Sequence, residues 1–224
     1  MKKDARLLIL LVFALLFSAA LSCGQPAVEG STAAPVEIAL PAPDTIGKVP
    51  VEQALAKRRS VRQFAPEDLT LSQIGQLCWA AQGITEPTHG LRTAPSAMAA
   101  YPLDLYVVKS DGVFRYLPQG HKLIKLSGED KRAAISTQAS VGAAPVVFVM
   151  VGVMSRTARF GPRAERFVAI EAGHVGQNLH LQAVALGLGS VSVGGFQDAD
   201  VVKALDLPEG QTPFYVIPVG KPAT

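Results

Sequence analysis

The sequence has few cysteines, few aromatic side chains and little net charge, and each shortage excludes a class of protein. The 224 residues include two cysteines, Cys23 and Cys78, which are too few for a scaffold held by disulfides. A net charge of +3 gives no strong positive field, so the composition does not indicate a nucleic-acid-binding protein. The sequence contains no CxxC, HExxH or clustered His/Cys spacing, and therefore indicates neither a structural zinc site nor a metalloprotease site.

Apolar and turn-forming residues are abundant instead. Hydrophobic residues make up 49% of the chain and charged residues 17%, so the chain can bury a full hydrophobic core. The length favours one domain. The 20 glycines and 16 prolines suit a mixed fold with many turns.

The first 22 residues resemble an export signal. Basic residues at positions 2, 3 and 6 precede an apolar run at 7–17, and small residues then lead to Cys23. Small residues directly before a cysteine are typical of a bacterial lipobox. We therefore expect cleavage after residue 22 and lipidation of Cys23, which would hold an exported protein at the periplasmic face of a cell-envelope membrane. The alternative is ordinary signal cleavage with Cys23 incidental.

Residues 23–43 are rich in Ala, Pro, Ser and Thr, which predicts an extended tether. We expect residues 44–224 to form the folded domain. Hydrophobic periodicity and turn residues predict helices at 51–57, 70–82, around 130–140, 162–187 and 198–205, and strands at 103–109, 113–117, 144–153, 190–193 and 214–219. The nearly continuous apolar run at 144–153 is typical of a central strand buried on both faces.

Residues 58–64 read Arg-Arg-Ser-Val-Arg-Gln-Phe and place three guanidinium groups and a hydroxyl within five residues. Arginine presents a planar fork of donors that suits a phosphate, and Ser60 adds one more hydrogen bond. We call residues 58–62 the arginine turn. One interpretation is a binding site for a phosphomonoester, and the other is a solvated basic patch after a helix.

Three other segments carry polar or small residues that could lie beside a ligand or at an interface. Small residues crowd 93–102, which lets the backbone approach a flat ligand closely, and Gly194 and Gly195 form a tight turn. The long predicted helix carries Glu171, His174 and neighbouring amides, which we expect to satisfy one another in the core or at an interface.

In this order, the arginine turn, the Pro-Ser-Ala segment at 95–97, the long helix, Gly-Leu-Gly at 187–189 and Gly-Gly-Phe at 194–196 resemble the nitroreductase family of flavoproteins. The resemblance runs from about residue 40 to residue 221 and is closest to the branch that includes azoline-oxidising dehydrogenases. It implies an α+β fold with a central mixed β-sheet flanked by helices, and a homodimer with FMN at the interface.

By position, the resemblance implies that the FMN phosphate and ribityl chain are held by Arg58, Arg59, Ser60 and Arg62. It implies that Pro95, Ser96 and Ala97 lie against the isoalloxazine edge of the flavin bound by the partner subunit. It further implies contacts from the backbone N–H groups of Gly194 and Gly195, from Lys221 near the phosphate, and from Gln138. An acidic residue common in the family is replaced by Gly194, and a common asparagine by Ala99 or a neighbour.

The first functional hypothesis is an FMN-dependent oxidoreductase that works by ping-pong transfer from a reduced donor such as NAD(P)H to a small electrophile, a nitroaromatic or a quinone. The second is a dehydrogenase that oxidises an azoline ring of a modified peptide. The third is a lipid-anchored flavin-binding protein without turnover. No catalytic residue is assigned, because Tyr101, His89 and His174, the candidate proton donors, each have a simpler structural role.

Overall fold

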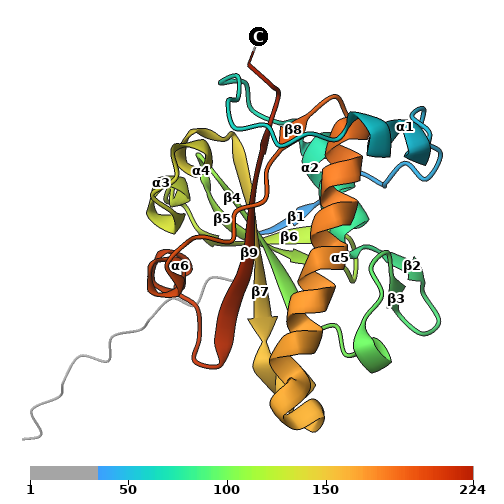
Figure 1. Ribbon diagram of the computed structural model, residues 1–224, viewed down its shortest axis with the longest axis vertical. Helices are drawn as coiled ribbons and strands as arrows, with labels where there is room; N and C mark the ends of the chain where they lie inside the picture. Colours follow the sequence, from blue (N-terminus) through green and yellow to red (C-terminus); the bar gives the residue numbers. More distant parts are fainter. Residues whose placement is uncertain (1–34, 224) are drawn as a thin grey trace, which may run out of the picture. The chain divides into compact units, whose positions relative to one another are not determined.

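Seven strands form the central sheet of this computed structural model, which describes residues 35–223 (Figure 1). The strand order is β1-β6-β5-β4-β7-β9-β8, and all neighbouring strands are antiparallel. A parallel bridge between Ser60 and Ser190 extends the sheet beyond β8, so the sheet is mixed, as predicted. The strands are β1 (Glu37–Ala39), β4 (Leu103–Lys109), β5 (Gly112–Leu117), β6 (Lys122–Ser127), β7 (Val146–Val153), β8 (Gly189–Ser190) and β9 (Gln211–Gly220).

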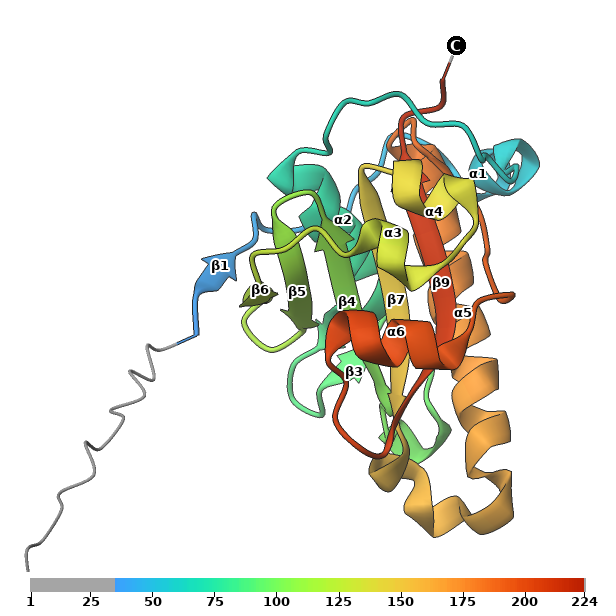
Figure 2. The same cartoon turned by 90° about the vertical axis from the view of Figure 1, so that its left-hand side faces the viewer.

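Helices cover both faces of this sheet, and a small hairpin lies apart from it (Figures 1 and 2). The hairpin consists of β2 (Ile84–Glu86) and β3 (Leu91–Arg92). The helices are α1 (Val51–Lys57), α2 (Leu71–Gln82), α3 (Arg132–Ile135), α4 (Ala139–Ala143), α5 (Ala164–Ala185) and α6 (Asp198–Leu205), with 3₁₀ segments η1 (Ala97–Ala99) and η2 (Met154–Arg163).

The core has two halves, one on each face of the sheet. On one face α2 and α5 pack through side chains such as Leu77 and Leu179. On the other face α3, α4 and α6 pack through side chains such as Ile135 and Val201, and Figure 2 shows these three helices in front of the sheet. β7 serves both halves because its side chains alternate between the two faces, and all but its last residue are buried. This confirms the predicted central strand.

Local capping chemistry explains where two helices begin and end. α2 starts where Thr70 accepts a hydrogen bond from the backbone N–H of Gln73 (3.2 Å), while the Gln73 side chain accepts one from the Thr70 N–H (2.9 Å), which is a capping box. α5 ends where Gly187 takes a positive φ of 71° and Leu188 donates its N–H to the Ala183 carbonyl (2.8 Å).

Two predicted helices have different bounds in the structure. The helix expected around 130–140 is split into α3 and α4 because Ser136 is extended and its hydroxyl accepts a hydrogen bond from the Gln138 N–H (3.2 Å), a local alternative to the helical bond. The long helix starts at Ala164 rather than at 162, because Gly161 has φ 55° and ψ −134° and Pro162 follows it.

The N-terminal edge of the sheet was not predicted. β1 lies within the segment 23–43, which was predicted to be an extended tether. Because β1 pairs with β6, residues 37–39 belong to the sheet instead. Leu40 is buried, and the carbonyl of Pro41 lies 3.0 Å from His121 Nε2. The predicted signal peptide and Cys23 lie outside the described residues. None of the helices at residues 35–223 is long and apolar enough to cross a membrane.

Candidate functional site

The arginine turn lies directly beside β8. The parallel bridge joins Ser60 to Ser190, and Val61 donates its N–H to the Ser190 carbonyl (3.0 Å). Close packing is part of this contact, because a Cβ added to Gly189 would lie 2.6 Å from the Cβ of Val61. Glycine at position 189 therefore lets the turn reach the edge of the sheet.

The side chains of the turn differ in how free they are. Ser60 and Arg62 are exposed, and Arg58 is half-buried. Arg59 folds back, with its Nη1 donating to the carbonyls of Ala56 (3.0 Å) and Arg58 (2.7 Å) at the end of α1. Arg58, Ser60 and Arg62 are thus better placed to bind a phosphate than Arg59, which caps a helix.

The predicted glycine pair lies a short distance along the chain from this turn. Gly194 follows Ser190 by four residues, which is at most about 14 Å of extended chain. Both glycines are exposed; an added Cβ would meet nothing within 4 Å at Gly194, and only Gln138 Nε2 (3.8 Å) at Gly195. Gln138 also donates to the Gly195 carbonyl (3.3 Å), so this residue does lie beside the glycines.

A buried histidine, which was not predicted to have a role, lies next to the same region. The two ring nitrogens of His180 on α5 lie 2.7 Å from Ser190 Oγ and 2.8 Å from Ser192 Oγ. Burial, and to a lesser extent the positive charge of Arg58, lower the pKa of His180 to about 4. A neutral ring therefore fixes the two hydroxyls at neutral pH, one as donor and one as acceptor.

Lys221 belongs to the same end of the sheet through its backbone. Its carbonyl accepts the N–H of Ala65 (2.8 Å), and Pro222 bridges Phe64. The lysine lines a hollow of about 270 Å³ together with the acidic residues Glu67 and Asp68. The structure thus brings the chain end next to the segment after the arginine turn.

The Pro95, Ser96 and Ala97 segment contacts a different part of α5. Ser96 Oγ accepts the N–H of Tyr101 (2.8 Å), and Met98 and Ala99 that follow both have φ 52°, an uncommon conformation for residues with a Cβ. No hydrogen bond or bridge at residues 35–223 joins this segment to the arginine turn. Within one chain, the two predicted halves of the site are therefore not joined by any such contact in the described residues.

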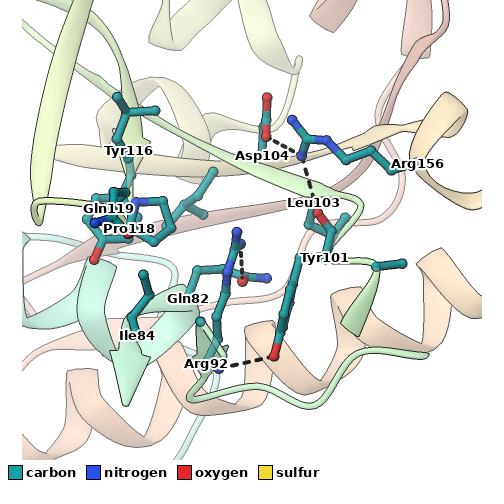
Figure 3. A pocket seen from close by; sticks show the side chains of 14 residues that line it. Gln82, Ile84, Arg92, Tyr101, Leu103, Asp104, Tyr116, Pro118, Gln119 and Arg156 are labelled. Carbon is teal, nitrogen blue, oxygen red and sulfur yellow. Dashed lines mark hydrogen bonds and ion pairs between the residues drawn. The ribbon is translucent and has the colours of Figure 1, made fainter. Parts of the chain in front are cut away.

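Polar residues near Ser96 form a second cluster, which lines a cavity of about 460 Å³ (Figure 3). Arg92 Nη1 donates to Gln82 Oε1 (2.9 Å), and the Arg92 guanidinium lies 4.4 Å from the centre of the Tyr101 ring. Burial raises the pKa of Glu171, which is 3% exposed, and the nearby Ser96 and Gln82 side chains oppose the rise. No functional role for Gln82 or Arg92 was predicted from the sequence.

Among the remaining candidate side chains, His89, Tyr101 and Cys78 have contacts or burial that account for them, and His174 is exposed. His89 is exposed in the β2–β3 hairpin and pairs with Glu86 (2.8 Å), and the Tyr101 hydroxyl accepts the Arg92 N–H (3.1 Å). His174 is exposed on α5. Cys78 is fully buried, and burial raises the pKa of its thiol well above the usual range, so it is an unreactive core residue.

Comparison with known proteins agrees with this arrangement. Residues 55–221 match the nitroreductase family. The chain belongs to that family. A nitroreductase-like protein of Methanocaldococcus jannaschii is 38% identical over 197 residues, which is 83% of this nitroreductase-family chain and 96% of the archaeal one.

A second relative and a solved structure extend the comparison. A protein of Methanothermobacter thermautotrophicus, named for NADH dehydrogenase and NAD(P)H nitroreductase activity, is 26% identical and covers 80% of each chain. The crystal structure of a nitroreductase-like protein from Ralstonia eutropha JMP134 has a TM-score of 0.80 and 34% identity, over 84% of this chain and 90% of that one. Family membership makes this protein an oxidoreductase and confirms the predicted fold.

Proposed function

We propose that the protein is an FMN-dependent oxidoreductase that passes electrons from NAD(P)H, or a similar reduced donor, to a small electrophile such as a nitroaromatic or a quinone. The observation that carries the proposal is the bridge between Ser60 and Ser190. Ser190 is followed by Gly194 within at most about 14 Å of extended chain, so the side chains that we propose to bind a phosphate lie close along the fold to a glycine pair with open space around it. Both can then contact one ligand that has a phosphate at one end and a flat ring at the other.

The residues present fit FMN in chemical type. Arg58, Ser60 and Arg62 offer charge-assisted hydrogen bonds to a phosphate. The N–H groups of Gly194 and Gly195 would face the ring, where a side chain would prevent close approach. When bound, the flavin supplies the redox chemistry, and the role of the protein is to hold and orient it and to set its potential. This explains why the sequence offers no evident nucleophile.

A homodimer is part of the same proposal. Because no hydrogen bond or bridge in the described part of the chain ties the segment at 95–97 to the arginine turn, this segment is free to contact the flavin of a partner subunit. The outward face of α5 supports this, since Ile170 is 50% exposed there and Gly173 and Gln177 are also exposed. Sedimentation of the purified protein at twice the mass of the chain is the expected result, and a monomer would contradict it.

The cofactor assignment is tested with purified full-length protein and its visible spectrum. We expect a yellow protein whose flavin absorption is bleached by NADH without oxygen and returns when a nitroaromatic is added. Arg58→Ala together with Arg62→Ala should weaken FMN binding by about 10-fold or more, because each change removes a charged donor. Arg163→Ala, which removes an exposed arginine at the end of η2, is the matched control and should bind FMN normally. Equal FMN occupancy in both variants would overturn the phosphate assignment.

Oxidation of an azoline ring remains the second candidate, supported by the Pro-Ser-Ala segment at 95–97. Turnover of NADH with a nitro substrate favours the first function. Conversion of an azoline-containing peptide with oxygen as acceptor, and no reduction of the flavin by NADH, favours the second.

We also propose that Cys23 is lipidated and holds the protein at the periplasmic face of the envelope, which labelling with radioactive palmitate in a bacterial host would test.

A further inference from the structure

Arg92 carries a positive charge that no acidic side chain neutralises directly. It lines the cavity of about 460 Å³ that also borders Tyr101 and Arg156 (Figure 3). Its guanidinium is half-buried, and its only side-chain hydrogen bond among residues 35–223 goes to the neutral amide of Gln82. No ion pair in that part of the chain includes Arg92. A partly desolvated charge of this kind favours an anionic partner.

The nearby carboxylates do not fill that role. Asp104 accepts a hydrogen bond from Arg156 (2.7 Å) and lies 3.6 Å from Arg115, so its single charge is already shared by two cations. Glu171 is buried, and it shares no ion pair with Arg92 among residues 35–223. Burial is the largest cause of the raised pKa of Glu171, although the positive charge of Arg92 opposes the rise, and the raised pKa reduces the negative charge that Glu171 can offer. The side chains that line the cavity therefore keep a net positive charge.

The cavity is shaped for an organic molecule rather than for a bare ion. Its volume falls in the range of small-ligand sites, roughly 300 to 1,000 Å³. Apolar side chains supply much of its wall, among them Ile84, Leu103 and Pro118, as Figure 3 shows. The Arg92 guanidinium lies over the Tyr101 ring and donates to Gln82, and these two contacts restrain it, which prepares it for a two-bond contact with a carboxylate.

We propose that this cavity binds a flat organic monoanion, with its carboxylate on Arg92 and its apolar body against Leu103 and Pro118. The Tyr101 that lines the cavity follows the segment at 95–97 by four residues. A bound acid that carries a nitro or quinone group would then be an electron acceptor, an extension that rests on the proposed function. The binding itself does not depend on turnover.

Binding is measured by titration calorimetry on the full-length protein as purified, without an electron donor. The probes are 4-nitrobenzoate and 4-nitrobenzamide, which share size and ring but differ in charge. The wild type should bind the acid about 10- to 100-fold more tightly than the amide. Arg92→Met should remove that preference, and Arg92→Lys should keep part of it, because lysine retains the charge but not the fork. Arg159→Met is the matched control, since Arg159 also stacks on an aromatic ring but lies outside this cavity, and it should retain the full preference.

Three results would overturn the proposal: equal binding of the acid and the amide, no binding of either, or a preference that survives in Arg92→Met. Circular dichroism establishes that each variant is folded, and if Arg92→Met fails that check, Arg92→Lys decides the question through its weaker preference. The visible spectrum of the same samples with NADH reports on the flavin separately. If the acid does not bind but NADH still reduces the flavin, the anion site is wrong and the proposed function stands. If NADH does not reduce the flavin, the proposed function is wrong whatever the acid does.

Discussion

Replacing Gly189 with alanine tests whether close packing holds the arginine turn at the edge of the sheet. The added Cβ would lie 2.6 Å from the Cβ of Val61 and 2.7 Å from both of its Cγ atoms. Carbon atoms pack best at about 3.5–4.0 Å, so the two segments must separate by roughly 1 Å. The closest atom is the Cβ of Val61, and the backbone fixes its position. A change of the Val61 rotamer therefore cannot relieve the crowding.

Overpacking of this kind costs about 1–3 kcal/mol of unfolding free energy. For a domain of this size the midpoint of thermal unfolding should fall by roughly 2–12 °C, measured by calorimetry. Gly194→Ala is the matched control, because its Cβ would meet nothing within 4 Å, and its unfolding free energy should stay within about 0.5 kcal/mol of wild type. Gly189→Ala should also weaken FMN binding, because the turn that holds Arg58 and Arg62 moves.

A double-mutant cycle separates crowding from a general loss of stability. Val61→Ala removes two of the three atoms that the new Cβ approaches, so Gly189→Ala should cost less in that background, by about 0.5 kcal/mol or more. The reasoning fails if Gly189→Ala is as stable as Gly194→Ala, or if its cost is the same with and without the Val61 side chain.

Two smaller predictions follow from the caps and the buried histidine. Thr70→Ala removes one half of the capping box of α2 and should lower the unfolding free energy by about 1 kcal/mol in chemical denaturation, whereas Ser72→Ala, on the exposed side of the first turn, should change little. The pKa of His180 is lowered from 6.5 to about 4, so as the pH falls the unfolded chain protonates this histidine before the folded chain does. The contribution of the neutral His180 ring to stability is therefore complete above pH 6.5 and declines from there to about pH 4. His180→Gln should have a shallower dependence of unfolding free energy on pH in that interval, and identical slopes would refute the assignment; His121, whose pKa burial also lowers, stays the same in both proteins.

Much of the fold could be predicted because local signals and burial agree. The strand β7 is apolar throughout, and the bounds of α1, α6 and β4 match the predicted ranges. β1 and β6 could not be predicted as well, since β1 has three residues in a proline-rich segment and β6 reads Lys-Leu-Ile-Lys-Leu-Ser, without a regular alternation of polar and apolar residues. The three-residue edge strand β1 depends on pairing with β6 for stability rather than on its own sequence.

The candidate site likewise has residues that could be predicted from the sequence and residues that could not. The arginine turn and the glycine pair have unusual compositions, so they stand out in the sequence. His180 and Arg92 do not, because one histidine in an apolar helix and one arginine in a hairpin are common features. Their importance comes from contacts with Ser192 and Tyr101, which lie 12 and 9 residues away and meet them only in the folded chain.

The helix α5 touches both regions, and this limits how the molecule can change over evolution. Glu171 lies near Ser96, and His180 contacts Ser190, nine helical residues further on, which is about 13.5 Å along the axis. An insertion or deletion of one residue between them would shift one end by about 1.5 Å and turn it by about 100° against the other. New substrate preferences should therefore arise by changes in the hairpin at 84–92, where length can vary, while the number of residues from 171 to 180 stays the same in descendants that keep their activity.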